Sequence, residues 1–115
     1  MSLAATTGSM SAGNDSAASI LGLTLNTAHA VGTCVVLLVA CDNTSATDGA
    51  TNEITSITDT YGNTWTKDFE WCNSRGSAGA GVTTALLHSV LTVALNGPSS
   101  LKVNFPNSIT SKVAF

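Results

Sequence analysis

Residues 33–42 read TCVVLLVACD, an unbroken run of β-branched and apolar side chains that ends at an Asp-Asn-Thr-Ser sequence. The run is long enough for a strand and too short for a typical isolated helix. Strands that are apolar at every position are typically covered on both faces. We therefore place this strand at the centre of a sheet, with Val36 and Leu38 in the hydrophobic core.

The segments around this run also carry strand signals. Residues 20–26 (ILGLTLN) and 101–105 (LKVNF) alternate large apolar residues with other residues, as half-buried strands do. Residues 106–107 (Pro-Asn) are expected to end the second of these strands, and residues 109–115 begin another. Residues 82–95 also fit helical spacing, but their β-branched residues, the flanking glycines and the lack of helix caps favour a strand.

The composition agrees with an all-β fold. Only 10% of the 115 residues are charged, against roughly 25% in an average soluble protein. The strong helix formers Glu, Lys and Arg are scarce, whereas Thr, Val, Ser and Gly are common. We predict an antiparallel β-sandwich, jelly-roll-like or immunoglobulin-like, over residues 19–115, with residues 1–18 as an N-terminal arm or edge strand. Because the sequence stops inside its last strand, the sandwich can be incomplete at its C-terminus.

The two tryptophans and the single tyrosine of the chain gather around one turn. Asp59 suits the first position of a type I turn, and Gly62 suits the left-handed position that closes a three-residue loop. Asp59 would then lie opposite Asn63. Carried back along both strands, this register predicts a β-hairpin with Ile57 across from Trp65.

Alternation along the second strand of this hairpin puts Trp65, Phe69 and Trp71 on one face. Because large aromatic residues are few, we expect Trp65 and Phe69 to point into the core. Trp71, near the strand end, and Tyr61, in the turn, are the expected contact residues for a ligand or partner. The predicted core residues are Trp65, Phe69, Ile57, Val36 and Leu38.

The chain has three cysteines. Cys34 and Cys41 lie seven residues apart on one predicted strand, about 23 Å at roughly 3.3 Å per residue, which is too far for a disulfide. Only a bridge that includes Cys72 is feasible. Free buried thiols that pack as small apolar side chains are the simpler interpretation.

Read in order, four segments resemble a β-sandwich family found in bacteriophage structural proteins and bacterial surface proteins. They are LTLNTAHAVGTCVVLLVACDN, ITSITDTYGNTWT, LTVALNGPSSLKVNF and ITSKVAF. The likeness covers residues 20–115, and its most specific part is SITDTYGNTWT at residues 56–66. Thr33 stands where the family often has Asp, and members usually continue with further strands beyond the equivalent of Phe115. The resemblance implies a sandwich for attachment or shell reinforcement, without a known active site.

Catalytic patterns are weak in this sequence, and we assign no catalytic residue. Neither His29 nor His88 has a convincing partner in sequence, and no G-x-S-x-G motif occurs. Asp68 and Glu70 would share one strand face, as paired carboxylates of glycosidases do, but the solvated face of a strand often shows the same pair. We expect a protein that is not an enzyme.

Cofactor and metal patterns are equally weak. Residues 76–81 (GSAGAG) lack the Lys-Ser/Thr of a phosphate-binding loop, and no CxxC or HxxxH spacing occurs. Residues 42–53 offer oxygen ligands for calcium at Asp42, Asp48, Asn52 and Glu53, but their spacing misses the EF-hand pattern. We therefore expect no cofactor and no metal, with calcium in that loop as the alternative.

Charge and hydropathy argue against two classes of partner, nucleic acid and the membrane. With four Lys and Arg in total and a net charge of -3, the chain lacks the basic patch that nucleic acid requires. No apolar run approaches the roughly 20 residues that cross a bilayer, and residues 1–10 lack the features of a signal peptide. Together with the resemblance above, which implies a virion role, the expected function is a phage virion structural protein, a capsid decoration or head-fibre-base protein or a tail component, which forms homo-oligomers and binds the major capsid or other virion proteins. The alternative is a carbohydrate-binding or adhesion module of a tail or cell-surface protein, extracellular, which binds glycans through Tyr61 and Trp71.

Overall fold

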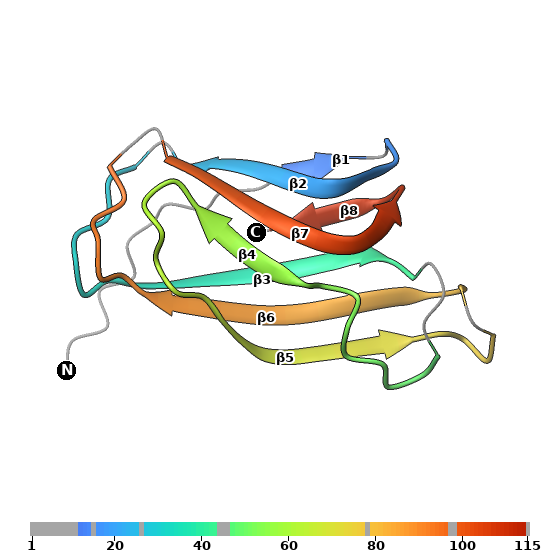
Figure 1. Cartoon of the computed structure of the whole chain (residues 1–115). Helices are drawn as coiled ribbons and strands as arrows, with labels where there is room; N and C mark the ends of the chain where they lie inside the picture. The colour runs from blue at the N-terminus through green and yellow to red at the C-terminus, as the bar shows by residue number, and fades with distance from the viewer. Residues whose placement is uncertain are drawn as a thin grey trace.

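The computed structural model describes residues 12–14, 16–25, 27–43, 47–77, 79–96 and 99–114. These residues form two antiparallel sheets that pack face to face, as Figure 1 shows. The strands are β1 (Ala12–Asn14), β2 (Ala18–Leu25), β3 (Cys34–Asp42), β4 (Ser56–Asp59), β5 (Thr66–Asn73), β6 (Val82–Val90), β7 (Ser99–Ile109) and β8 (Lys112–Ala114). The prediction of an all-β sandwich is confirmed.

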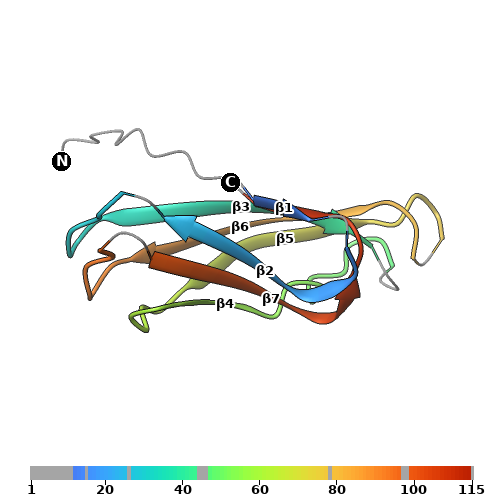
Figure 2. The ribbon, with the colours of Figure 1, turned by 90° about the horizontal axis from the view of Figure 1, so that it is seen from above.

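One sheet has five strands in the order β1-β8-β3-β6-β5, and the other has three in the order β2-β7-β4. Seen from above in Figure 2, β2 and β7 run obliquely to β3 and β6. Of the predicted arm, residues 12–14 form β1 at one edge of the five-stranded sheet, and residues 1–11 lie outside the described residues. The described part of the chain contains no helix long and apolar enough to span a bilayer.

The core lies between the two sheets and is built from alternate residues of each strand. On β3 the inward residues are Leu37, Val39 and Cys41, all at most 3% exposed. Val36 and Leu38 point the other way and are each 54% exposed, so their assignment to the core was wrong. Because β3 is apolar at both alternating sets of positions, the pattern alone does not indicate which set meets the second sheet.

The other core residues come from both sheets. Leu21, Leu23 and Leu25 of β2 belong to the same buried cluster as Leu87 of β6, and the prediction for Ile57 is confirmed, because it is buried in this cluster. Residues 82–90 form a strand, as predicted, and Leu95 beyond it makes an isolated bridge to His29.

The turn at Asp59–Asn63 has the predicted hydrogen bonds and positive φ, but the two strands that it connects do not pair with each other. The Asp59 Oδ1 atom accepts hydrogen bonds from the backbone N–H groups of Tyr61 (2.8 Å) and Asn63 (3.3 Å), and Gly62 has a φ of 76°. β4 pairs with β7, however, whereas β5 pairs with β6. The chain therefore crosses from one sheet to the other at this turn (Figure 1), and the expected hairpin with Ile57 opposite Trp65 was wrong.

Side-chain hydrogen bonds explain why the turn becomes an arch between the sheets. The indole N–H of Trp65 donates to Asp59 Oδ2 at 2.9 Å, and Trp65 packs against the core, which confirms its inward position. The Asn63 side-chain oxygen accepts from the backbone N–H groups of Thr92 and Val93, both at 2.9 Å. These bonds anchor the turn to the segment that follows β6.

The predicted break at Pro106-Asn107 does not occur, since β7 continues to Ile109. The pairing of β7 with β2 shifts register here: Asn104 pairs with Ile20, but Ile109 pairs with Ala18. The additional residues of β7 bulge out of the ladder. A proline, which has no N–H to donate, is tolerated in such a bulge.

Candidate functional site

A bulge in β5 decides which side chains reach the protein surface. Lys67 pairs with Leu87 and Phe69 with the adjacent Leu86, so Asp68 is an extra residue in β5. From Phe69 onward, each side chain of β5 therefore points to the face opposite the one that regular alternation predicts. Trp65 therefore packs inward, whereas Phe69 is 53% exposed and Trp71 is 52% exposed on the opposite face. The assignment of Phe69 to the core was wrong for this reason, and Trp71 is exposed as expected.

The exposed apolar residues of three adjacent strands form one continuous surface, which we call the outer face. The strand register aligns Leu38 with Leu86 and Phe69 in one row, and Ala40 with Thr84 and Trp71 in the next. Six large apolar side chains of this face are 43–55% exposed: Val36, Leu38, Phe69, Trp71, Val82 and Val90. The expected contact residue Tyr61 is also exposed but lies in the turn before β5, at the other end of that strand from Trp71.

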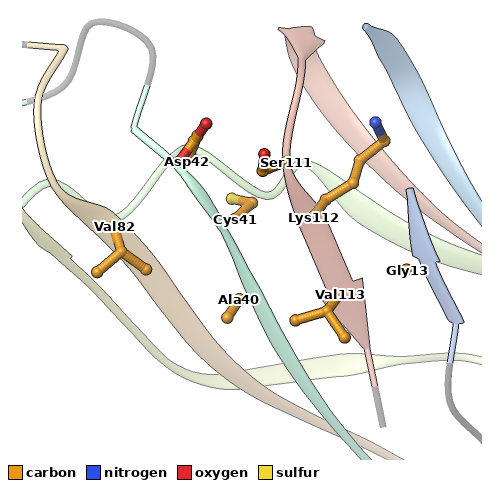
Figure 3. A pocket seen from close by; sticks show the side chains of 8 residues that line it. All are labelled: Gly13, Ala40, Cys41, Asp42, Val82, Ser111, Lys112 and Val113. Carbon is orange, nitrogen blue, oxygen red and sulfur yellow. The ribbon is translucent and has the colours of Figure 1, made fainter. Parts of the chain in front are cut away.

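A hollow of about 380 Å³ continues the outer face toward β1. It forms because small residues flank a larger one: Gly13 of β1 and Ala40 of β3 lie on either side of Val113, and Val82 lies beyond Ala40 (Figure 3). Lys112 lines the hollow, but its ammonium group is buried and donates to the carbonyl oxygens of Ile109 (2.7 Å) and Ser16 (2.8 Å). The hollow is therefore mainly apolar, with Asp42 and Ser111 at its polar end.

The outer surface of the three-stranded sheet is different in character. Its exposed residues include Thr24 of β2, Thr58 of β4 and Lys102 of β7, and Ile20 is its exposed large apolar residue. Hydroxyl and charged groups of this kind are well hydrated. The sandwich thus has one apolar and one polar outer surface.

The outer face carries one polar pair that the sequence did not predict. His88 Nδ1 lies 2.6 Å from Asp68 Oδ2, although neither histidine had been given a partner. The two residues are 20 positions apart, and the bulge on β5 turns Asp68 toward β6. A His-Asp pair can orient a catalytic base, but the strand residues directly across from His88 are Val36 and Thr66, neither of which is a strong nucleophile. We interpret the pair as a polar contact within the outer face.

Asp68 and Glu70 do not share a face, contrary to the paired-carboxylate alternative. Glu70 points into the sandwich and is buried, with its Oε2 atom bound to the ammonium group of Lys67. Its Oε1 atom accepts from the backbone N–H groups of Glu53 (2.5 Å) and Ile54 (3.1 Å). This carboxylate holds the loop before β4 against the edge of β5, so its role is structural.

The loop that was the alternative calcium site is held by protein groups. Asp48 Oδ1 accepts hydrogen bonds from the backbone N–H (2.6 Å) and hydroxyl (2.8 Å) of Ser74, which lower the pKa of Asp48. Gly49 and Ala50 form backbone hydrogen bonds with Cys72 of β5. Within the described ranges no three His, Cys, Asp or Glu side chains are grouped to hold a metal ion.

All three cysteines are free thiols. Cys41 and Cys72 lie on either side of Thr83 in the five-stranded sheet, about 9.6 Å apart at two strand spacings, which is beyond disulfide reach. Both are buried, whereas Cys34 is exposed. Burial, with smaller contributions from the carboxylates of Glu53 and Glu70, raises the pKa of Cys41 to about 12.

The raised pKa of Cys41 predicts a loss of stability at alkaline pH. The unfolded thiol ionises near its ordinary pKa of 9.0, whereas the folded thiol keeps its proton to about 12. Above pH 9 the unfolded state therefore binds fewer protons, and the free energy of unfolding falls as the pH rises toward 12. Urea unfolding across this range measures the slope, which should be shallower in Cys41→Ala and unchanged in Cys34→Ala. If the wild type, Cys41→Ala and Cys34→Ala had equal slopes, the pH dependence would not come from Cys41.

The comparisons with known proteins give no relative: the chain matches no protein-family model, no curated protein and no solved structure. The likeness to virion and surface proteins therefore rests on the sequence segments within residues 20–115.

Proposed function

We propose that the protein is a structural protein of a phage virion, a capsid decoration or head-fibre-base protein, which acts by docking rather than by catalysis. The observation that supports this function is the outer face, which presents large apolar side chains over three adjacent strands. In a permanent assembly such a face is buried against a neighbouring subunit.

The size of the outer face favours a docking role. Its six large apolar side chains are about half exposed, which corresponds to about 600 Å² in total at roughly 100 Å² each. The largest apolar patch of a typical monomer is about 300–600 Å², and such patches are often interaction sites. A standard interface buries about 800 Å² on each partner, including its polar rim. The outer face supplies the apolar centre of one such interface.

The distribution of charge also favours docking. Interface centres are depleted of charged residues, and the outer face carries only the Asp68-His88 pair and Asp42 at the hollow. The opposite surface, on the three-stranded sheet, carries hydroxyl groups and Lys102. One apolar and one hydrated surface suit a subunit of an assembly that is covered by a neighbour on one side and faces solvent on the other.

Co-sedimentation with capsids tests the proposal. The purified chain is mixed with empty capsids assembled from the major capsid protein encoded in the same genome. We expect the wild-type chain to pellet with the capsids. Leu38→Asp should lower its affinity at least about tenfold, since it places a charge at the centre of the outer face. Thr24→Asp, on the outer surface of the three-stranded sheet, is the matched control and should bind like the wild type.

A second function is supported by one observation, the exposure of Phe69 and Trp71 on the same face. Flat aromatic surfaces of this kind stack on sugar rings, as in a glycan-binding or adhesion module of a tail or cell-surface protein. Titration with a panel of oligosaccharides, followed by tryptophan fluorescence, separates the two functions. A saturating shift that is lost in Trp71→Ala, together with no binding to capsids, would favour the glycan-binding module.

A further inference from the structure

We infer that the outer face binds a second copy of the same chain, so that two sandwiches pair through their five-stranded sheets about a twofold axis. The inference rests on the proposed function only in that it uses the same face for docking. It goes further by naming the neighbour: another copy rather than a different virion protein.

The pattern of β3 indicates that its outer side is covered. Its inner residues Leu37, Val39 and Cys41 meet the three-stranded sheet, and the outer residues Val36 and Leu38 are as apolar as the inner ones. Strands that are apolar on both sides are generally covered on both sides. Among the described residues the chain supplies a second layer only on the inner side. A further sheet packed about 10 Å away would complete the pattern.

The shape of the outer face is suited to pairing with itself. Leu38, Leu86 and Phe69 form a row of larger side chains, and the hollow between Val113 and Val82 lies beside it. In a twofold pair the same surface is used on both copies, so a projecting part must meet a recess of the identical surface. On the outer face, the row is the projecting part and the hollow is the recess.

The charges of the outer face do not oppose self-association. Asp68 is paired with His88 of the same chain, and Asp42 lies away from the row, at the hollow. Two identical faces therefore meet without an unpaired like charge at their centre. The apolar area, about 600 Å² on each copy by the estimate above, approaches the roughly 800 Å² per partner of a standard interface.

Sedimentation velocity of the full chain tests the inference. We expect a dimer at micromolar concentrations, and Leu38→Asp should raise the dissociation constant at least about 100-fold. Phe69→Asp, on the neighbouring strand, provides a second change in case the first variant fails to fold, which circular dichroism would show. Thr24→Asp is the matched control and should remain dimeric. Acrylamide quenching should increase in the monomeric variants because Trp71 is uncovered, while Trp65 stays packed on the core.

The possible outcomes separate this inference from the proposed function. A wild-type chain that remains monomeric up to about 200 μM would overturn it, as would a dimer that neither outer-face substitution weakens. If the chain is monomeric but binds capsids, the neighbour on the outer face is a capsid subunit, and the proposed function stands without the pair. If it is dimeric but binds no capsid, the pair stands and the virion function fails.

Discussion

Replacement of Glu70 by alanine is expected to lower the free energy of unfolding by about 2–6 kcal/mol, because two backbone N–H groups lose their buried acceptor at about 1–3 kcal/mol each. The Glu70 carboxylate is buried, binds the ammonium group of Lys67 and accepts hydrogen bonds from the backbone of Glu53 and Ile54. Without it, the backbone N–H groups of Glu53 and Ile54 lose this buried acceptor, while the ammonium group of Lys67 keeps its bonds to the carbonyl oxygens of Thr51 and Ile54. Urea denaturation monitored by tryptophan fluorescence measures the change.

Two comparisons show whether the loss comes from this network. Asp68→Ala removes a carboxylate from the same strand, but one that lies on the surface beside His88, so the expected cost is below about 1 kcal/mol. Glu70→Gln keeps an acceptor oxygen, so its free energy of unfolding should lie between those of the wild type and Glu70→Ala. If Glu70→Ala cost no more than Asp68→Ala, the carboxylate would be hydrated rather than buried, and the loop before β4 would be held by other contacts.

The strands themselves could be predicted because each carries a local signal. The leucines of β2 alternate, β3 is continuously apolar, and the glycines around β6 argue against a helix. Asp59, Gly62 and Asn63 also marked their turn correctly, since the preference for a side-chain acceptor and for a positive φ is local.

The partners of the strands could not be predicted in the same way. A turn of this type is common in hairpins, yet here Asn63 binds the backbone of Thr92 and Val93, and β4 joins β7 instead of β5. Contacts across almost 30 residues decided between hairpin and arch. No local feature of the sequence carries that information.

The outer face was missed for a related reason. A single extra residue at Asp68 inverts the alternation of β5, which moves Phe69 from the expected core to the surface and Glu70 from the surface to the interior. The ion pair of Lys67 and Glu70 reflects the same bulge, because residues three apart do not share a face on a regular strand. The outer side of β3 was apolar in the sequence, but only the structure shows that this chain leaves it open.

Replacement of Gly81 by alanine is the second change with a large expected effect. Gly81 has a φ of 83°, and a Cβ atom there would lie 1.8 Å from the backbone oxygen of Asn73, the last residue of β5. The left-handed conformation costs about 1–2 kcal/mol for a residue with a side chain, and the overlap adds about 1–3 kcal/mol as the backbone shifts. We expect the free energy of unfolding to fall by about 2–5 kcal/mol, measured by urea denaturation.

Gly76 in the same connection between β5 and β6 provides the matched control. It has nearly the same φ, 84°, but a Cβ atom would meet nothing within 4 Å. Gly76→Ala therefore carries the conformational cost alone, about 1–2 kcal/mol, and the difference between the two variants isolates the overlap with Asn73. Since Asn73 pairs with Val82 directly after Gly81, that overlap can be relieved only if the end of the β5–β6 ladder opens. Equal losses in the two variants would mean that this end of the ladder opens at little cost, and that the close approach of Gly81 to Asn73 does not hold it together.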